Sequence, residues 1–265
     1  MERHRRGKGK QQLLGNHQKC WIWGRHAVLE TLKAACWPIL DLCVSADLPE
    51  DERESALACA RQGGVPARVE SSALLEQVCH STEHQGYLAR MSAFPYADED
   101  QVLRAAGPTP AFAICDSIQD PHNFGAMVRS AEVLGLDGVF IGEIGQAGVT
   151  SMVVRSSAGA VNRVPIVRVA DLDALAGRLA AHGVRLVAAT EKAVATLAAF
   201  AFTGSVAVIV GNEGVGIRPS LLAACQTHVC IPQCGRIGSL NAAVAAAIVF
   251  YEIRRQRGMP NRGNE

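Results

Sequence analysis

Short apolar runs alternate with segments of helical periodicity from residue 111 to residue 257. Runs rich in Val and Ile without polar interruption are typical of strands that are buried on both faces of a parallel sheet. The candidate strands are 111–115, 138–142, 164–169, 184–190, 206–211 and 228–232, and the candidate helices are 123–135, 150–157, 171–181, 218–224 and 239–257. The pattern predicts an α/β domain whose parallel sheet is covered by helices on both faces.

The first hundred residues predict a different organisation. Residues 1–20 are charged and lack a period, so we expect a basic disordered tail. Residues 21–96 form a smaller α/β unit with candidate helices at 24–35, 51–62 and 71–79 and candidate strands at 39–44, 65–69 and 86–94. Residues 97–110 contain two prolines and predict a linker with one short helix, and residues 258–265 predict a second tail.

Composition narrows the class of protein. The 265 residues carry a net charge of +1, with 49% hydrophobic and 19% charged residues, as in soluble globular proteins. No apolar run reaches the roughly 18 residues that span a membrane, and the N-terminus lacks the apolar core of a secretory signal. We expect a cytoplasmic protein, with organelle import left open. Basic residues gather at 3–10 and 254–262. Both groups could bind phosphates, or the first could belong to a solvated tail and the second to a helix end, where positive charge is favourable.

The nine cysteines indicate free thiols, because no C-x-x-C spacing occurs. Cys225, Cys230 and Cys234 lie close together in the sequence. Their spacings of five and four match no standard zinc motif, and no histidine follows at ligand spacing. The sequence therefore predicts no metal site.

Three segments at the carboxyl ends of predicted strands carry candidate chemistry, because ligands bind at that edge of open α/β sheets. In the first, residues 116–140, Asn123 stands at the start of a helix and Arg129 lies about two turns further. Asn123 suits either an N-cap or a functional role. In the second, residues 209–222, three glycines surround Asn212 and Glu213. Their spacing matches neither a dinucleotide fingerprint nor a phosphate-binding loop, but it lets backbone groups approach a ligand closely.

The third segment, residues 231–257, runs from Ile231-Pro232 through a glycine-containing loop into a helix rich in alanine. We expect this helix to begin at Ser239, which is a favourable N-cap residue. Its small side chains permit close packing against another element, either inside one chain or across a dimer.

Together the three segments resemble the signature motifs of the SpoU/TrmH family of RNA 2′-O-ribose methyltransferases. The matching patterns are D-P-x-N-x-G-A-x-x-R, then G-N-E-G-x-G, then I-P followed by S-L-N before a small-residue helix. Residues 155–166 resemble the family's Ser-x-Gly-Ala stretch. WGRHAVLETL and HQGYLA, in residues 21–96, resemble the substrate-binding domain of the rRNA-modifying branch, which is similar to RNA-binding ribosomal proteins.

The resemblance implies a SPOUT-like catalytic domain over 111–257, with a deep trefoil knot that holds S-adenosylmethionine, and a homodimer formed through the knotted region. It assigns to Arg129 the activation of the ribose hydroxyl, with Asn123, Glu213, Ser239 and Asn241 in orienting roles. Because a guanidinium holds its proton tightly, the resemblance leaves open whether Arg129 is a base or an electrostatic stabiliser. The implied cofactor contacts are Thr190, Gly211, Asn212, Gly216, Ile231 and Leu240.

The resemblance favours a guanosine of large-subunit rRNA as substrate, because tRNA-modifying relatives often have only short extensions around the knot. A tRNA ribose methyltransferase and a non-catalytic RNA-binding protein are the alternatives. A nicotinamide oxidoreductase is disfavoured, since the first strand of the larger domain lacks the glycine fingerprint. Gly238, Ala243 and Gln233 depart from common residues of the family, but none replaces a core motif position. Housekeeping and antibiotic-resistance roles both fit.

Overall fold

The computed structural model describes residues 21–258, which divide into two compact units. The first unit holds the described residues up to Pro95 together with Gly148–Arg163. The second holds Tyr96–Ala147 and the described residues from Val164 onward. The predicted tail at 1–20, with its basic residues, and residues 259–265 of the second predicted tail lie outside the described residues.

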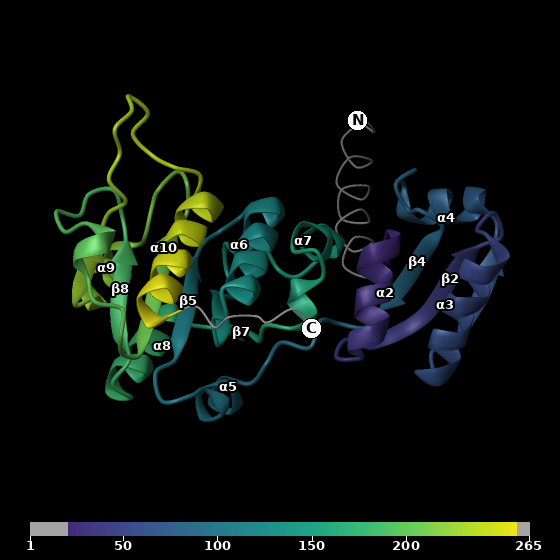
Figure 1. Cartoon of the computed structure of the whole chain (residues 1–265), viewed down its shortest axis with the longest axis horizontal. Coiled ribbons are helices and arrows are strands. Elements are labelled where there is room, and N and C mark those ends of the chain that lie inside the picture. Colours follow the sequence, from purple (N-terminus) through teal and green to yellow (C-terminus); the bar gives the residue numbers. More distant parts are fainter. Residues whose placement is uncertain (1–20, 259–265) are drawn as a thin grey trace, which may run out of the picture. The chain divides into compact units, whose positions relative to one another are not determined.

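A four-stranded sheet forms the centre of the first unit (Figure 1). Its strand order is β1-β4-β2-β3, in which β2 and β3 run parallel and the other two pairs run antiparallel. Its elements are β1 Trp21–Trp23, α2 Arg25–Ala34, β2 Ile39–Ser45, α3 Glu50–Gln62, β3 Ala67–Glu70, α4 Ser72–Cys79 and β4 Tyr87–Met91. The sequence predicts these elements apart from β1, whose three residues are too few to show a period.

The segment Gly148–Arg163 packs in the first unit, although the chain enters and leaves it from strands of the second. It forms α7 (Ser151–Ser156) and the short helix η1 (Ala160–Asn162). The amide nitrogen of Asn162 donates to the hydroxyl of the fully buried Thr31 at 3.0 Å. Arg163 pairs with Glu30 at 2.7 Å. These contacts fix the segment to α2.

The second unit is built on a six-stranded parallel sheet with the order β10-β8-β9-β5-β6-β7. The central strands β5 and β9 are buried over nearly their whole length, as continuous apolar runs predict. The strands are β5 Ala111–Asp116, β6 Gly138–Gly142, β7 Ile166–Val169, β8 Arg185–Ala189, β9 Val206–Gly211 and β10 Thr227–Val229. The helices are α5 Glu99–Ala105, α6 Pro121–Val133, α8 Leu172–Ala181, α9 Pro219–Ala224 and α10 Ala242–Arg257, with the short helix η2 at Leu197–Ala199.

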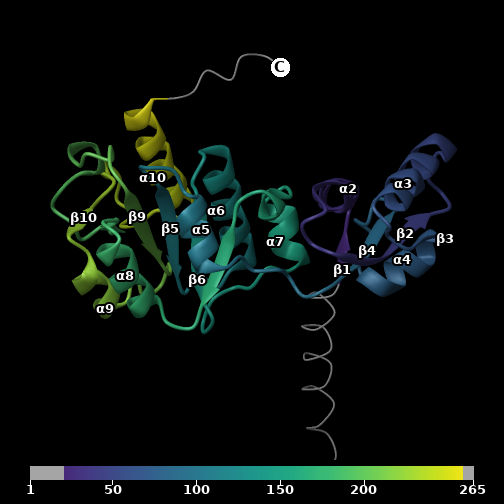
Figure 2. The ribbon, with the colours of Figure 1, turned by 90° about the horizontal axis from the view of Figure 1, so that it is seen from below.

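Helices cover both faces of this sheet (Figure 2). On one face, Val102 of α5, Leu175 of α8 and Leu221 of α9 pack into a core with alternate strand residues. On the other face, α6 and α10 pack against each other, and α10 also packs on β8 and β9. The segment that sequence predicts as a linker, 97–110, therefore supplies α5 to the core of this unit. No helix within residues 21–258 combines the length and the apolar character needed to cross a bilayer.

Two arginines near the end of α10 bind backbone carbonyls inside the second unit. Arg254 donates to the carbonyl oxygens of Leu134 and Gly135, just beyond the end of α6. Arg257 donates to four carbonyl oxygens, those of Thr109, Pro110, Phe202 and Gly204. Burial lowers the pKa of Arg257. Arg254 and Arg257 therefore stabilise the second unit, a role that the sequence did not predict.

Arg257→Ala should lower the free energy of unfolding by about 1.5–3 kcal/mol, because it removes charged donors from four carbonyls. Urea denaturation followed by circular dichroism measures this change. The control is Arg104→Ala on α5, an exposed arginine with no hydrogen bond or ion pair to the described residues, and this change should cost less than about 0.5 kcal/mol. Equal midpoints for the two variants would contradict the structural role of Arg257.

Candidate active site

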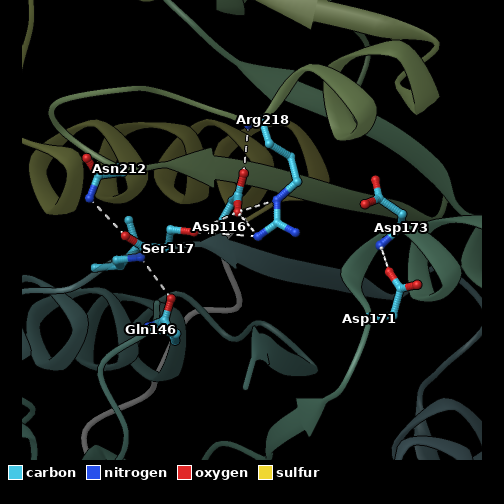
Figure 3. A network of polar contacts seen from close by, with 8 residues as sticks. Asp116, Ser117, Gln146, Asp171, Asp173, Asn212 and Arg218 are labelled. Carbon is cyan, nitrogen blue, oxygen red and sulfur yellow. Dashed lines mark hydrogen bonds and ion pairs between the residues drawn. The ribbon is translucent and has the colours of Figure 1, made fainter. Parts of the chain in front are cut away.

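A buried carboxylate joins two loops at the carboxyl end of the parallel sheet (Figure 3). Asp116 ends β5 and is only 1% exposed. It accepts hydrogen bonds from Nε of Arg218 at 2.8 Å, from Nη2 of the same side chain, and from the Arg218 backbone nitrogen at 2.8 Å. The hydrogen bond that Arg218 donates to Asp116 raises the pKa of Arg218, and the nearby charges of Asp173 and Asp171 act in the same direction. The loop after β9 is therefore fixed to the end of β5.

Asn212 makes a second connection between these loops. Its side-chain nitrogen donates to the carbonyl oxygen of Ser117 at 2.9 Å, and its side-chain oxygen accepts from the Gly214 nitrogen at 2.8 Å. On the other side of the β5 loop, Oε1 of Gln146 accepts from the Ile118 nitrogen at 2.8 Å (Figure 3). Backbone polar groups in both loops are thus satisfied by side chains, which holds an irregular backbone in one shape.

Close approach of backbone explains a glycine of the second motif. A Cβ atom on Gly211 would lie 2.3 Å from the carbonyl carbon of Gly216 and 2.3 Å from the Ile217 nitrogen. Gly216 itself has φ +75°, a left-handed conformation that favours glycine. Backbone hydrogen bonds between Asn212 and Gly216 close this tight loop in both directions.

Side chains of all three motifs meet in one polar cluster. The side-chain nitrogen of Asn123 donates to Oε1 of Glu213. The side-chain nitrogen of Asn241 donates to Oδ1 of Asn123 at 3.0 Å. These residues lie 90 and 118 positions from Asn123 in sequence, so only the fold brings them together. We call Asn123, Glu213 and Asn241 the motif cluster.

The predicted N-cap of the last helix is wrong, and the structure excludes the N-cap as one of the two roles left open for Asn123. Asp120, not Asn123, caps α6 by accepting from the His122 nitrogen, because Pro121 occupies the first helical turn. Asn241, not Ser239, caps α10 by accepting from the Ala243 and Val244 nitrogens. Asn123 is therefore free to use its amide in the motif cluster, and Ser239 lies in an exposed loop before the helix.

Arg129 does not join the motif cluster. It lies six residues beyond Asn123 on α6, a rotation of about 240° on a helix of 3.6 residues per turn. Its side chain is exposed and makes no hydrogen bond or ion pair to any residue between 21 and 258. The guanidinium is therefore available to a bound ligand.

Two neighbouring cavities lie at the carboxyl ends of β8, β9 and β10. The larger, of about 350 Å³, is bordered by the loops after β8 and β9 and by the start of α10; the smaller, of about 70 Å³, adjoins β10. Thr190 and Leu240 border both. The larger cavity is also bordered by Gly211, Asn212, Glu213 and Gly216, and the smaller cavity is also bordered by Ile231. Ser239 borders both cavities. The residues implied as cofactor contacts thus surround one continuous region.

Sequence reasoning missed several residues of this region. Asp116 and Arg218 gave no motif signal, although a charged residue at the end of a buried strand marks Asp116 as unusual. Glu191 and Lys192 border the larger cavity and were also missed. Within residues 21–258, no three His, Cys, Asp or Glu side chains are grouped closely enough to hold a metal ion.

Comparison with known proteins agrees with this architecture. The model of the SpoU rRNA Methylase family matches residues 110–251, and that of the RNA 2′-O ribose methyltransferase substrate-binding domain matches residues 21–97. A 23S rRNA (guanosine-2′-O-)-methyltransferase RlmB from Shewanella oneidensis is 32% identical over 238 residues, 89% of this chain and 97% of the relative. An uncharacterized tRNA/rRNA methyltransferase from Mycobacterium tuberculosis is 34% identical over 247 residues, 92% of this chain and 76% of the relative.

The crystal structure of the SpoU methyltransferase AviRb from Streptomyces viridochromogenes, in complex with the cofactor AdoMet, superposes with a TM-score of 0.79. The match has 25% sequence identity and covers 96% of this chain and 98% of that chain. It confirms the predicted fold class, while the trefoil knot itself stays a prediction. The chain belongs to the SpoU rRNA methylase family, with the family's RNA 2′-O ribose methyltransferase substrate-binding domain in its first hundred residues.

Proposed function

We propose that this S-adenosylmethionine-dependent RNA 2′-O-methyltransferase acts on a guanosine of large-subunit rRNA. The observation that carries the proposal is the motif cluster, which ties the three family motifs together beside the larger cavity. Glu213 belongs to both, because it borders that cavity and accepts from Asn123. A cofactor in the cavity and a hydroxyl group near the cluster would therefore be held by the same loops.

The larger cavity suits S-adenosylmethionine. Its volume of about 350 Å³ lies within the range of small-ligand sites. Gly211 and Gly216 border it without side chains that would fill it, and the carboxylates of Glu191 and Glu213 provide negative charge. The bound cofactor supplies a methyl group on a positively charged sulfur. We propose Thr190, Gly211, Asn212, Gly216, Ile231 and Leu240 as its contacts.

The protein must then orient a ribose hydroxyl and stabilise the loss of its proton. The oxygen has to lie in line with the methyl group within about 3–3.5 Å. Arg129 carries a permanent charge, so it acts by stabilising negative charge on the oxygen or by pairing with a neighbouring phosphate. Asn123 fixes the Glu213 carboxylate and Asn241 fixes Asn123, and Ser239 contributes a hydroxyl at the cavity border.

The choice of rRNA over tRNA rests on the substrate-binding domain and on the RlmB relative, whose name specifies a guanosine of 23S rRNA. A tRNA substrate is the second candidate, because the Mycobacterium relative is named for tRNA and rRNA together. We propose a cytoplasmic location, with import into an organelle as the alternative.

A homodimer is part of the proposal. Large apolar side chains are exposed at the end of α6, just before α10 and along α10: Val133 is 59% exposed, Leu240 39%, Val244 48% and Tyr251 49%. Exposed apolar side chains that recur on neighbouring helices indicate an interaction surface. The family resemblance gives a second copy of the chain as the occupant of this surface.

Wild-type protein should transfer label from methyl-labelled S-adenosylmethionine to large-subunit rRNA, in a product that resists alkaline hydrolysis. Arg129→Ala should lower the rate by about a hundredfold or more, as expected when a charged transition-state contact is lost. Arg104→Ala is the matched control, because that exposed arginine lies on α5, outside the motif segments. Label confined to tRNA would refute the rRNA assignment, and tight RNA binding without any label would support the non-catalytic alternative.

Gly211→Ala should weaken binding of S-adenosylmethionine at least about tenfold and destabilise the fold by about 1–3 kcal/mol, because the added methyl group collides with backbone. Isothermal titration calorimetry and thermal melting measure the two effects. Gly177→Ala on α8 is the control, since nothing lies within 4 Å of its added Cβ, and it should be neutral or slightly stabilising. Unchanged affinity in Gly211→Ala would remove this loop from the cofactor site.

The double change Val244→Asp with Tyr251→Asp should convert the dimer to monomer, because it places charge on the exposed apolar surface. Light scattering after size-exclusion chromatography measures the mass. Val194→Asp is the control, because Val194 is 99% exposed and lies outside this surface. A wild-type chain that runs as a monomer, or a double variant that still dimerises, would reject this interface.

A further inference from the structure

The first unit contains a cavity of about 370 Å³ that the proposed chemistry does not use. It lies between the end of β1, the first turn of α2, the segment before β4, and α7. Trp23, Ala27 and Val154 form apolar walls, and the side chains of His26, Glu83, Gln85 and Arg155 border the same space. An apolar cavity with a few polar groups around it is the usual form of a small-ligand site.

The backbone around Gln85 is held in an uncommon conformation. Gln85 has φ +51° and the adjacent Gly86 has φ +79°. The side-chain oxygen of Gln85 accepts from the Arg25 nitrogen at 3.0 Å. Its side-chain nitrogen has no partner among the described residues, so it remains a donor at the cavity border. Left-handed backbone at a residue other than glycine often marks a binding site.

Arg155 and Glu83 form the opposite side of the cavity. They make an ion pair, and the Arg155 guanidinium lies 5.9 Å from the centre of the Trp23 ring. Trp23 is 6% exposed, and its indole nitrogen is buried without a hydrogen-bond partner among residues 21–258. The Arg155 side chain is 34% exposed, so its guanidinium plane offers a surface on which a planar ligand can stack, while Trp23 forms an apolar wall of the cavity.

We propose that this cavity binds an unstacked nucleobase of the RNA substrate. Proteins recognise single-stranded RNA by stacking bases on aromatic or guanidinium planes and by hydrogen bonding to base edges. A base edge carries both donors and acceptors, which matches an acceptor on Glu83 and a donor on Gln85. A phosphate group accepts hydrogen bonds only, so the Glu83 carboxylate would repel it. An apolar side chain would leave the polar groups of the border unpaired.

This inference rests on the proposed RNA methyltransferase function but concerns a separate site. Every residue of the cavity belongs to the first unit, whereas the motif cluster and the cofactor cavities belong to the second. It also gives a role to two sequence segments that the chemistry leaves unexplained, HQGYLA and the Ser-x-Gly-Ala stretch. Gln85 comes from the first and Arg155 from the second.

Tryptophan fluorescence of the full-length protein provides the test. The sequence has three tryptophans, at positions 21, 23 and 37, all in the first unit, so their emission reports on that unit alone. The probes are the four nucleoside 5′-monophosphates, with ribose 5-phosphate as the probe that lacks a base. We expect saturable quenching by at least one nucleotide and none by ribose 5-phosphate.

Glu83→Gln and Gln85→Ala should each weaken this binding by about tenfold, because the first replaces a charged acceptor with a neutral one and the second removes a donor. Glu54→Gln is the matched control, because Glu54 is exposed in the same unit and pairs only weakly, with Arg61 at 3.9 Å. Three outcomes would overturn the proposal. Ribose 5-phosphate quenches the fluorescence as the nucleotides do, none of the four nucleotides gives saturable quenching, or wild type and both variants bind with equal affinity.

Methyl transfer to rRNA separates this inference from the proposed function. Glu83→Gln should raise the KM for RNA while kcat stays within about twofold, because the cavity binds RNA without touching the reacting atoms. A wild-type enzyme that fails to methylate any RNA refutes the proposed function, whether or not the nucleotides quench the tryptophan fluorescence. A wild-type enzyme that methylates rRNA, with an unchanged KM in Glu83→Gln, refutes only the nucleobase cavity.

Discussion

The candidate active site depends on one buried charge, the carboxylate of Asp116 at the end of the central strand β5. A carboxylate that is 1% exposed is tolerated only when it is paired and hydrogen-bonded. Arg218 meets that requirement with two side-chain nitrogens and its own backbone nitrogen. Breaking the pair would leave the charge uncompensated, so the loop after β9 is held to the end of β5.

The other contacts of the site follow from this attachment. With the loop after β9 in place, Asn212 reaches the carbonyl of Ser117, and Gly211 lies against the backbone at Gly216. Glu213 then comes within hydrogen-bond distance of Asn123. Since Asn241 caps α10 with its oxygen and binds Asn123 with its nitrogen, the start of the last helix is set by the same group of contacts.

Local pattern was enough to predict the order and class of the elements, because strands buried on both faces are continuously apolar. It failed where tertiary contacts decide the outcome. Ser239 is as good an N-cap residue as Asn241, but Asn241 also binds Asn123, a contact between distant segments that the local pattern does not show. Asp116 and Arg218 are 102 residues apart, so no spacing rule could pair them. The catalytic assignment of Arg129 came from family resemblance, because its exposed position makes no contact that points to a role.

The segment Gly148–Arg163 borders the proposed nucleobase cavity and continues, along the chain, from residues that contact the loop after β5. Its packing belongs to the first unit, where Arg155 borders the proposed nucleobase cavity. The residues immediately before it hold the loop after β5: the Ala147 nitrogen donates to the Ile118 carbonyl at 2.8 Å, and Gln146 accepts from the Ile118 nitrogen. Ile118 follows Asp116 by two positions. The loop that the Asp116 carboxylate anchors is therefore hydrogen-bonded to Gln146 and Ala147, the two residues from which the chain continues directly into the segment that carries Arg155.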